Sequence, residues 1–505
     1  MLQRILDLPV FVIFVIIGCL MMYIPALHAL DREAFHIARS FFYSGTLGLV
    51  LCALIGIAFS TRPVHHTALQ HLASLLAVFA LMPLVLAVPF HEALRTTTFL
   101  NAYVEMVSCL TTTGASLFSP DRLPPSLHLW RGMVGWTGGL LMWISAAAIL
   151  APLNLGGFEV TASAAPGQGG LRRVDIRAAS PGQRLIRATK RLLPIYTGLT
   201  LVLWVCLIAG GATPFDGLMH AMATLATSGI SAVGGLEEVT SPGLGGEFVI
   251  FLFLFFAVSR LTFSTDTITG NTRGLHEDPE FRIGLILVIG VPLLLILRHW
   301  LGAFDVNEED NIIDGLRAFW GGMFTVMSFL TTTGFVSAEW DSAQGWSGLA
   351  TPGMILMGLA LMGGGVATTA GGVKLLRVFT LYLNGVREMQ KLIHPSSVGG
   401  RGANNRRIRR QGAYTAWVFF MLFALSVTLV VLVMTAYGAS FQDALVLAVA
   451  ALSTTGPLLD VASSEVISLA DIPSGAKLAF AAATVLGRLE TLAIIALLSP
   501  DLWRR

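Results

Sequence analysis

Long apolar runs alternate with short polar connections along the chain. The apolar runs cover residues 9–27, 46–59, 72–88, 140–153, 199–208, 248–258, 283–297, 416–433 and 478–498. A helix needs about 20 mostly apolar residues to cross a bilayer, and several runs reach that length only with their flanks. The pattern predicts an all-α polytopic membrane protein. Because the first run is long for a cleaved signal peptide, we interpret it as a retained span.

A second pattern occurs four times, where an apolar stretch ends in hydroxyl side chains and a glycine. The stretches read SCLTTTGAS, ATLATSGIS, SFLTTTGFV and AALSTTGPL. Each has a leucine four positions before the glycine, a threonine two before it and a further hydroxyl one before it. The aligned positions are Thr112, Thr113 and Gly114; Thr227, Ser228 and Gly229; Thr332, Thr333 and Gly334; and Thr454, Thr455 and Gly456.

A helix start is predicted at a fixed distance before each of these glycines. Thirteen residues earlier stand Asn101, Asp216, Gly321 and Asp443, all of types accepted at helix N-caps. We predict Asn101, Asp216 and Asp443 as caps of short helices, each covering only about half the bilayer. Such a segment must enter the membrane and turn back, which is tolerated where the turn is buried or lines a wet cavity. Four turns around one axis would aim helix C-termini and carbonyls at its centre, and this predicts an ion selectivity filter.

The segment LMGGGVATTAGGVKLLR, after the third stretch, is unusually rich in glycine. Glycine destabilises a helix by about 1 kcal/mol relative to alanine. Two interpretations remain open: a glycine-rich packing face, or an unwound mobile loop beneath the filter that blocks the pore. The candidate gate residues are Gly363, Gly364, Gly365, Thr368, Thr369, Gly371, Gly372 and Lys374. Lys374 either snorkels to the cytoplasmic interface or places a positive charge in the cation path.

Three ionisable residues lie inside apolar segments. Arg488 lies in the last run, where an unpaired charge costs several kcal/mol. Because Glu490 lies on another helical face, we predict that Arg488 faces inward and bonds to loop carbonyls or to an acid of another repeat. Glu105 and His220 lie on the first and second short helices, and we interpret them as structural supports rather than ion ligands.

Composition and charge indicate how the chain lies in the membrane. It has 505 residues, of which 54% are hydrophobic and 12% charged, whereas globular domains are about a quarter charged. Basic residues dominate the connections at 172–191 and 387–410, and acidic residues those at 237–247, 305–314 and 460–471. Since basic loops stay in the cytoplasm, the acidic ones are predicted to face outward. The four cysteines show no paired spacing and are interpreted as core residues.

These features resemble the Trk/Ktr/HKT superfamily of cation-translocating proteins, and its TrkH-type branch in particular. Besides the four hydroxyl–glycine stretches and the 363–374 loop, the resemblance rests on LHLWRGMVGWTGGLLMW at 127–143, REMQKLIHPSSV at 387–398 and LGRLETLAIIALLSP at 486–500. It covers the chain from about residue 95 to the end. Two positions depart from the family pattern: Ala226 lacks the hydroxyl found in the other three stretches, and Ala370 replaces a glycine common in relatives.

The resemblance implies four pseudo-repeats of helix–pore-helix–helix around one central pore, plus two N-terminal transmembrane helices. The expected limits are 1–65 for the N-terminal helix pair; 66–155, 186–272, 280–395 and 411–500 for the repeats; 156–185 and 396–410 for cytoplasmic loops; and 363–372 for a gate loop. It also implies the cytoplasmic (inner) membrane as location, with both termini in the cytoplasm.

The resemblance further implies K+ as the transported ion, bound around the filter hydroxyls, and Arg488 beneath the filter. It implies a homodimer, and a cytoplasmic TrkA-like nucleotide-binding ring as regulatory partner. In the family a glycine at the filter position of all four loops goes with K+ preference, so Gly114 favours K+. The expected function is therefore potassium uptake through a gated, channel-like filter, driven by a membrane potential that contributes about 2.3 kcal/mol per charge per 100 mV.

Several other functions are weighed against this one. An H+- or Na+-coupled symporter usually needs a titratable group in the pathway, and Glu105, Asp216 and Asp443 keep this alternative open. An intramembrane enzyme would need clustered His, Asp or Glu at ligand spacing, which the sequence lacks, so no enzyme is expected. No GxxxxGK[ST] motif is present, and we expect no organic cofactor on this chain. Membrane lipid is an expected partner, and nucleic acid is not.

Overall fold

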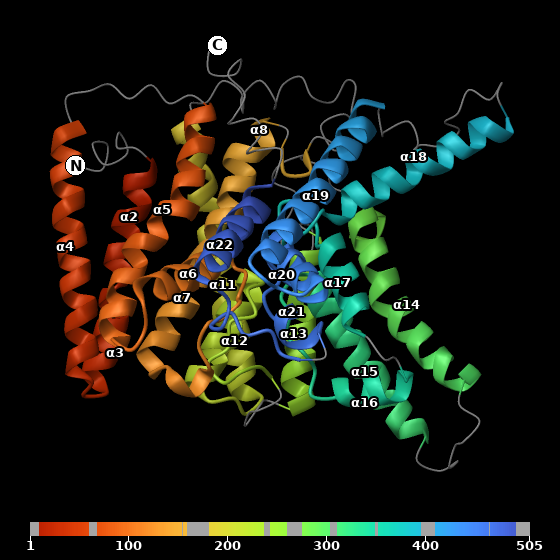
Figure 1. Cartoon of the computed structure of the whole chain (residues 1–505), viewed down its shortest axis with the longest axis horizontal. Coiled ribbons are helices and arrows are strands. Elements are labelled where there is room, and N and C mark those ends of the chain that lie inside the picture. The colour runs from red at the N-terminus through yellow and green to blue at the C-terminus, as the bar shows by residue number, and fades with distance from the viewer. Residues whose placement is uncertain are drawn as a thin grey trace.

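Helices account for most of the described chain, and no strand occurs within it (Figure 1). The computed structural model describes residues 10–59, 68–153, 155–158, 181–236, 243–259, 275–302, 311–348, 352–394, 410–463 and 465–490. Basic residues 172–177 and 401–409, acidic residues 305–310 and residues 491–498 of the last apolar run lie outside these ranges. The all-α prediction is confirmed.

The helices follow one another in chain order with short connections. The first are α2 (Val10–Met21), α3 (Tyr23–Asp31) and α4 (Phe35–Phe59). Next come α5 (Ala68–Leu94), α6 (Phe99–Leu110), the 3-10 turn η1 (Pro120–Arg122), α7 (Pro125–Ser145), the π-helical turn η2 (Ala146–Leu150) and α8 (Ala151–Leu153). They are followed by α11 (Pro181–Ala209), α12 (Pro214–Ala226) and α13 (Gly243–Val258).

The second half of the chain continues in the same manner. It contains η3 (Leu275–Glu277), α14 (Pro279–Gly302), α15 (Asn311–Leu330), α16 (Trp340–Ser347), α17 (Gly353–Met362) and α18 (Leu375–Ile393). The last described helices are α19 (Arg410–Ala436), α20 (Phe441–Ser453), α21 (Leu458–Val461) and α22 (Ser474–Leu489). Most of them run roughly parallel, whereas α18 leaves the body obliquely at the upper right of Figure 1.

Long and short apolar helices are combined in this fold. Among the described residues, seven helical stretches are long and apolar enough to span a membrane: Phe11–Asp31, Phe35–Ala58, Gln70–Leu94, Pro125–Leu153, Gly182–Ala209, Pro279–Leu297 and Gly412–Ala436. The apolar helices α6 and α20 have only 12 and 13 residues, which is too short to cross. A multi-pass membrane protein follows from these lengths.

A three-helix packing arrangement occurs four times along the chain. A long helix packs against the helix that carries a hydroxyl–glycine stretch at its end, in the pairs α5–α6, α11–α12, α14–α15 and α19–α20. A later helix of the same unit also packs against that element, in the pairs α6–α7, α12–α13, α15–α17 and α20–α22. Each element that carries a stretch is therefore in contact with two other helices of its unit (Figure 1).

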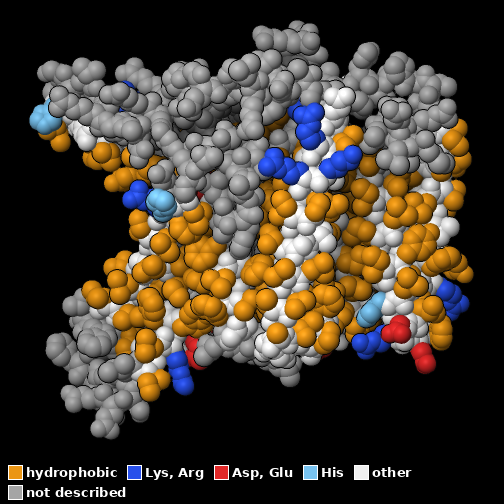
Figure 2. All heavy atoms as spheres, turned by 180° about the vertical axis from the view of Figure 1, so that it is seen from behind, with side chains coloured by type: hydrophobic (Ala, Val, Ile, Leu, Met, Phe, Trp, Pro, Cys, Tyr) orange, Lys and Arg blue, Asp and Glu red, His pale blue; other side chains and the backbone are white. Residues whose placement is uncertain are grey.

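The outer surface is suited to lipid. Large apolar side chains such as Ile57 on α4, Leu294 on α14 and Leu425 on α19 are exposed. Figure 2 shows apolar side chains across the middle of the described surface, with most of the charged ones above and below. This distribution is what a bilayer requires of the helices that line it.

The structure differs from the sequence expectations at three places. Residues 181–185, expected in a cytoplasmic loop, form the start of α11. Glu247, counted with an acidic connection, is buried in α13. The last apolar run is not one helix, because α22 ends at Leu489 and Glu490 adopts a left-handed backbone with φ of 64°. Arg488 therefore stands in the last turn of a helix, where a cation interacts favourably with the helix dipole.

Candidate functional site

The starts of the short helices differ from the prediction by three residues. Asn101, Asp216 and Asp443 are not caps but third residues of the first turn. The side chains that accept the hydrogen bonds of their backbone amides belong to Thr98, Thr213 and Ser440. Both aspartates also accept a hydrogen bond from the cap hydroxyl, at 2.6 Å for Asp216 and 2.7 Å for Asp443. In the third unit α15 begins at Asn311, so Gly321 lies inside the helix.

The four hydroxyl–glycine stretches end their helices in one shared conformation. We call residues 112–114, 227–229, 332–334 and 454–456 loops 1 to 4. The threonine two before the glycine is left-handed in every loop: Thr112 (φ 55°), Thr227 (φ 50°), Thr332 (φ 58°) and Thr454 (φ 55°). The next amide bonds the carbonyl five residues earlier at 2.8 to 2.9 Å, as in a Schellman motif. Glycine normally takes the left-handed position, and a β-branched residue there is strained by about 1–3 kcal/mol.

Hydroxyl groups support these loops from behind. In loops 1, 3 and 4 the side-chain oxygens at positions three and one before the glycine lie 2.8, 3.1 and 3.1 Å apart. Ala226 removes this contact from loop 2, where the Thr227 hydroxyl donates to the Ala226 carbonyl at 2.8 Å. The hydroxyl oxygens of Thr112 and Thr454 are buried and have no hydrogen-bond partner in the described chain.

The loops touch one another in chain order. A Cβ added at Gly114 would collide with the Ser228 carbonyl oxygen of loop 2, and one at Gly229 with the Thr333 carbonyl of loop 3. At Gly334 it would lie 2.7 Å from Cγ of Pro457, which follows loop 4. Loop 4 returns to loop 1 because the Gly456 amide donates to the Thr113 carbonyl at 2.6 Å. All twelve predicted filter residues therefore belong to one contiguous set of loops.

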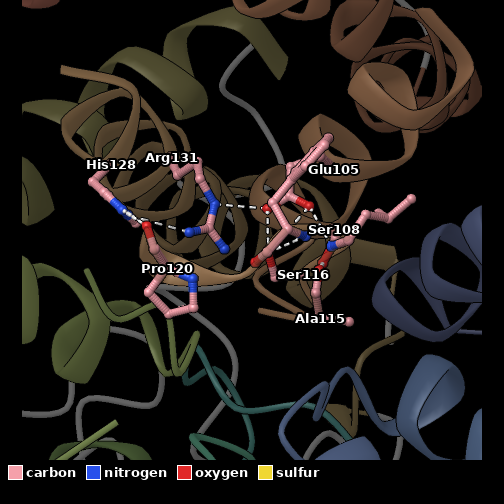
Figure 3. Close-up of polar contacts among 9 residues, drawn as sticks. Glu105, Ser108, Ala115, Ser116, Pro120, His128 and Arg131 are labelled. Carbon is pink, nitrogen blue, oxygen red and sulfur yellow. Dashed lines mark hydrogen bonds and ion pairs between the residues drawn. The ribbon is translucent and has the colours of Figure 1, made fainter. Parts of the chain in front are cut away.

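Glu105 and His220 lie beside this set. The carboxylate of Glu105 accepts a hydrogen bond from the Leu117 amide at 2.8 Å and forms an ion pair with Arg131 at 2.6 Å (Figure 3). His220 Nε2 lies 3.3 Å from the Ser231 hydroxyl. Each contact joins a short helix to the segment after its glycine, so these side chains act as structural supports, as predicted.

The glycine-rich segment breaks its helix, which agrees with the second of the two interpretations of its sequence. α17 ends at Met362 and α18 begins at Leu375, and the residues between them form a buried loop. Gly363 and Gly372 have left-handed φ values of 70° and 75°. Gly363 closely faces Gly371 and Gly372, because a Cβ added at Gly363 would collide with the Gly371 carbonyl oxygen and one added at Gly372 would collide with the Gly363 backbone. Glycine is therefore required by a tight reversal and not only by packing against a neighbouring helix.

This loop lies directly against loops 3 and 4 and against the end of α12, which leads into loop 2. The Thr369 hydroxyl donates to the Leu225 carbonyl at the end of α12 at 3.1 Å. The Gly371 amide donates to the Thr332 hydroxyl of loop 3 at 2.7 Å. A Cβ at Gly371 would collide with the Ser453 carbonyl and the Thr454 hydroxyl of loop 4.

Contacts with α13 and α14, and hydrogen bonds within the loop, hold the 363–374 loop in place. The Gly365 amide donates to the Ala257 carbonyl at 2.9 Å, and the Val366 amide to Glu280 Oε1 at 2.8 Å. Lys374 is buried and its ammonium donates to the Ala370 carbonyl, so it does not snorkel to an interface. Within the loop, the Thr368 hydroxyl donates to the Gly365 carbonyl at 2.8 Å.

Arg488 bonds to the loop as predicted, and a second buried arginine lies near it. Nη1 of Arg488 donates to the Thr369 carbonyl at 2.7 Å, while Nε and Nη2 have no partner within the described chain. Arg377, at the start of α18, pairs with Glu490 at 2.6 Å and stacks over the Phe419 ring at 3.7 Å. Arg377 was not identified from the sequence. The signal that could have identified it is Glu490, an acid in an apolar run that needs a positively charged partner from another segment.

The chain is similar to known transport proteins. A family model described as "TrkH: Cation transport protein" matches residues 244–504. The Trk system potassium uptake protein TrkH of Salmonella typhimurium is 31% identical over 81% of this chain and 80% of its own length. The corresponding protein of Escherichia coli strain K12 is 30% identical, with coverage of 81% and 80%. The crystal structure of the potassium transporter TrkH from Vibrio parahaemolyticus covers 100% of both chains with a TM-score of 0.81 at 24% identity, which establishes the shared fold.

Proposed function

Because the chain belongs to the TrkH family of cation transport proteins, we propose that it carries K+ into the cell through loops 1 to 4. It is then a transporter and not an enzyme. The observation that carries the proposal is the left-handed threonine that all four loops share. Glycine would fit this backbone without strain, so the hydroxyl group is the property that a threonine adds there.

The surroundings of these threonines suit a dehydrated cation. The C-terminal ends of α6, α12, α15 and α20 lead into the loops, and helix C-termini carry partial negative charge. Hydroxyl and carbonyl oxygens can replace the hydration shell of K+, and the unpartnered oxygens of Thr112 and Thr454 suit this role. The left-handed glycines Gly114, Gly229 and Gly334 let neighbouring backbones approach as closely as they do.

The 363–374 loop is proposed as the gate of this pathway. Its contacts support this role: it bonds to the Leu225 carbonyl at the end of α12 and to the Thr332 hydroxyl of loop 3, and it closely approaches Thr454 of loop 4. Opening requires these contacts and the bond from Arg488 to Thr369 to be exchanged for others. We propose that a cytoplasmic TrkA-like nucleotide-binding ring drives this change, and that the protein is a homodimer in the inner membrane with both termini cytoplasmic. The organisation of the family supports these proposals.

The coupled symporter is the less favoured alternative. Its candidate proton or ion carriers are Glu105, Asp216 and Asp443. Glu105 is already paired with Arg131, and the two aspartates bond to the cap hydroxyls at the helix starts, away from the loops. This distribution favours electrodiffusion along the membrane potential.

Uptake in bacteria that lack their own potassium uptake systems tests the proposal. The protein, expressed with a TrkA-like subunit, is expected to restore growth at limiting K+. Thr112→Val, which removes an unpartnered hydroxyl, is expected to weaken growth much more than Thr428→Val, an exposed position on α19 whose hydroxyl bonds only its own helix. Failure of the unchanged protein to restore growth, or equal growth with both variants, would contradict it.

A further inference from the structure

In three of the four units, the residue nine positions before the loop glycine bonds to the segment that follows this glycine. Nine residues before each glycine stand Glu105, His220, Thr325 and Leu447. The first three bond to a residue two or three positions after the glycine of their own loop. Leucine has no polar atom, so the fourth loop lacks this support. The support differs in chemistry from loop to loop, and only in loop 1 is it charged.

Glu105 makes the strongest of these contacts. Its side chain is fully buried, and it accepts hydrogen bonds from the Leu117 amide at 2.8 Å and the Ser116 hydroxyl at 3.2 Å (Figure 3). One helical turn further, the Ser108 hydroxyl donates to the Ala115 carbonyl at 2.6 Å. The segment just beyond Gly114 is therefore fastened to α6 at two points.

Arg131 of α7 completes the support behind loop 1. Its Nε donates to Glu105 Oε1 at 2.6 Å, and its Nη1 lies 3.4 Å from Nδ1 of His128. His128 in turn places Nε2 3.0 Å from the Pro120 carbonyl. Replacing a buried ion pair by apolar residues is often neutral or stabilising, so stability does not account for this one. We instead explain the ion pair by its effect on position, because it holds the segment after Gly114 in place.

A buried carboxylate also holds the segment after loop 3, but it belongs to a different helix, α13. Glu247 of α13 is buried and accepts hydrogen bonds from the Ala338 amide at 2.8 Å and the Ser337 hydroxyl at 2.8 Å. A carboxylate therefore holds the segment after the glycine in loops 1 and 3. Loop 4 lacks this contact and instead bonds to loop 1 through the Gly456 amide and the Thr113 carbonyl. Loop 4 is thus joined directly to loop 1.

We propose that Glu105 and Arg131 are positioning residues that set the K+/Na+ selectivity of the filter. The inference rests on the proposed function. The pair fixes Leu117. Only two residues separate Leu117 from Gly114, so the pair also restrains the backbone of Gly114 and the neighbouring Thr113 carbonyl, which bonds to loop 4. Because K+ and Na+ differ mainly in size, a filter that relaxes at loops 1 and 4 together accepts the smaller ion more readily.

The test is the reversal potential of purified protein in liposomes under a K+/Na+ gradient. Glu105→Gln keeps an acceptor for the Leu117 amide but leaves Arg131 without its carboxylate. We expect the permeability ratio to fall by about tenfold, which corresponds to about 1.4 kcal/mol. A reversal potential does not depend on how many molecules are active, so a purely structural defect would lower the flux and leave the potential unchanged. Glu92→Gln, at an exposed carboxylate on α5, is the matched control.

A double variant covers the case in which Glu105→Gln does not assemble. Glu105→Gln combined with Arg131→Met removes both charges and leaves no unpaired ion. We expect it to assemble and to show the lowered ratio, because the charged hold on Leu117 is gone. A wild-type ratio in either assembled variant would overturn the inference. If the unchanged protein itself shows no preference for K+, the proposed function fails, and the inference fails with it.

Discussion

Adding a single methyl group at Gly371 should open the proposed gate. This residue lies in the 363–374 loop, and its φ is not left-handed, so the alanine backbone is allowed. The new Cβ would collide with the Ser453 carbonyl and the Thr454 hydroxyl, which belong to a packed helix end and cannot move aside cheaply. The loop must therefore withdraw from loop 4, and the bond from its amide to Thr332 is lost as well.

The expected size of the effect follows from these two losses. Overpacking in a tight interior costs about 1–3 kcal/mol, and the lost hydrogen bond adds about 1 kcal/mol. The closed arrangement is then destabilised by about 2–4 kcal/mol. At 1.4 kcal/mol per factor of ten, the open population rises roughly 30-fold to several hundredfold while it remains the minor state.

Rubidium flux into liposomes, measured without any regulatory subunit, reports this population. Gly358→Ala is the matched control, because Gly358 lies in α17 just before the loop and an added Cβ would contact nothing within 4 Å. We expect a large basal flux from Gly371→Ala and wild-type flux from Gly358→Ala. Wild-type basal flux from a well-assembled Gly371→Ala protein would refute the assignment of this loop as the gate.

Three further predictions concern the filter and its supports. Gly114→Ser should lower the K+/Na+ permeability ratio, because any side chain at this left-handed residue meets the Ser228 carbonyl, and an unchanged reversal potential would place Gly114 outside the filter. Thr112→Gly should raise the melting temperature measured in a choline salt, by relieving about 1 kcal/mol of strain. It should also reduce the further rise in melting temperature that K+ gives. An equal rise on adding K+ in the variant and the unchanged protein would argue against this hydroxyl as a ligand. Arg377→Met should sharply reduce the monodisperse fraction in size-exclusion chromatography, since breaking a buried pair costs about 3–5 kcal/mol. Adding Glu490→Met should restore most of that fraction, because no unpaired ion is left. An unchanged fraction in Arg377→Met would show that the pair contributes nothing.

The helix ends at loops 1 to 4 and the helix break at 363–374 could be predicted because their signals are local. Three hydroxyls and a glycine after an apolar helix predict a helix end wherever they occur, and four aligned copies identify the positions residue by residue. The break at 363–374 follows from the density of glycine in a stretch that would otherwise span the membrane. The caps were less certain for a local reason too, because aspartate and asparagine suit both the cap and the first turn. The structure places the caps at Thr98, Thr213 and Ser440.

The supports of the filter depend on contacts that sequence spacing does not reveal. Arg131 lies 26 residues from Glu105, and Arg377 lies 113 residues from Glu490. Neither pair follows a helical period, because each joins two separate segments of the chain. The left-handed threonines were also hidden, since β-branched residues disfavour that conformation and only tertiary contacts impose it.

The most direct test of this account is the reversal potential of the purified protein in liposomes under a K+/Na+ gradient, with and without a pH gradient. If loops 1 to 4 form a selective electrodiffusive pathway, the potential follows the K+ gradient and does not respond to pH. A potential that shifts in a fixed ratio with the pH gradient would contradict the account and establish coupled transport.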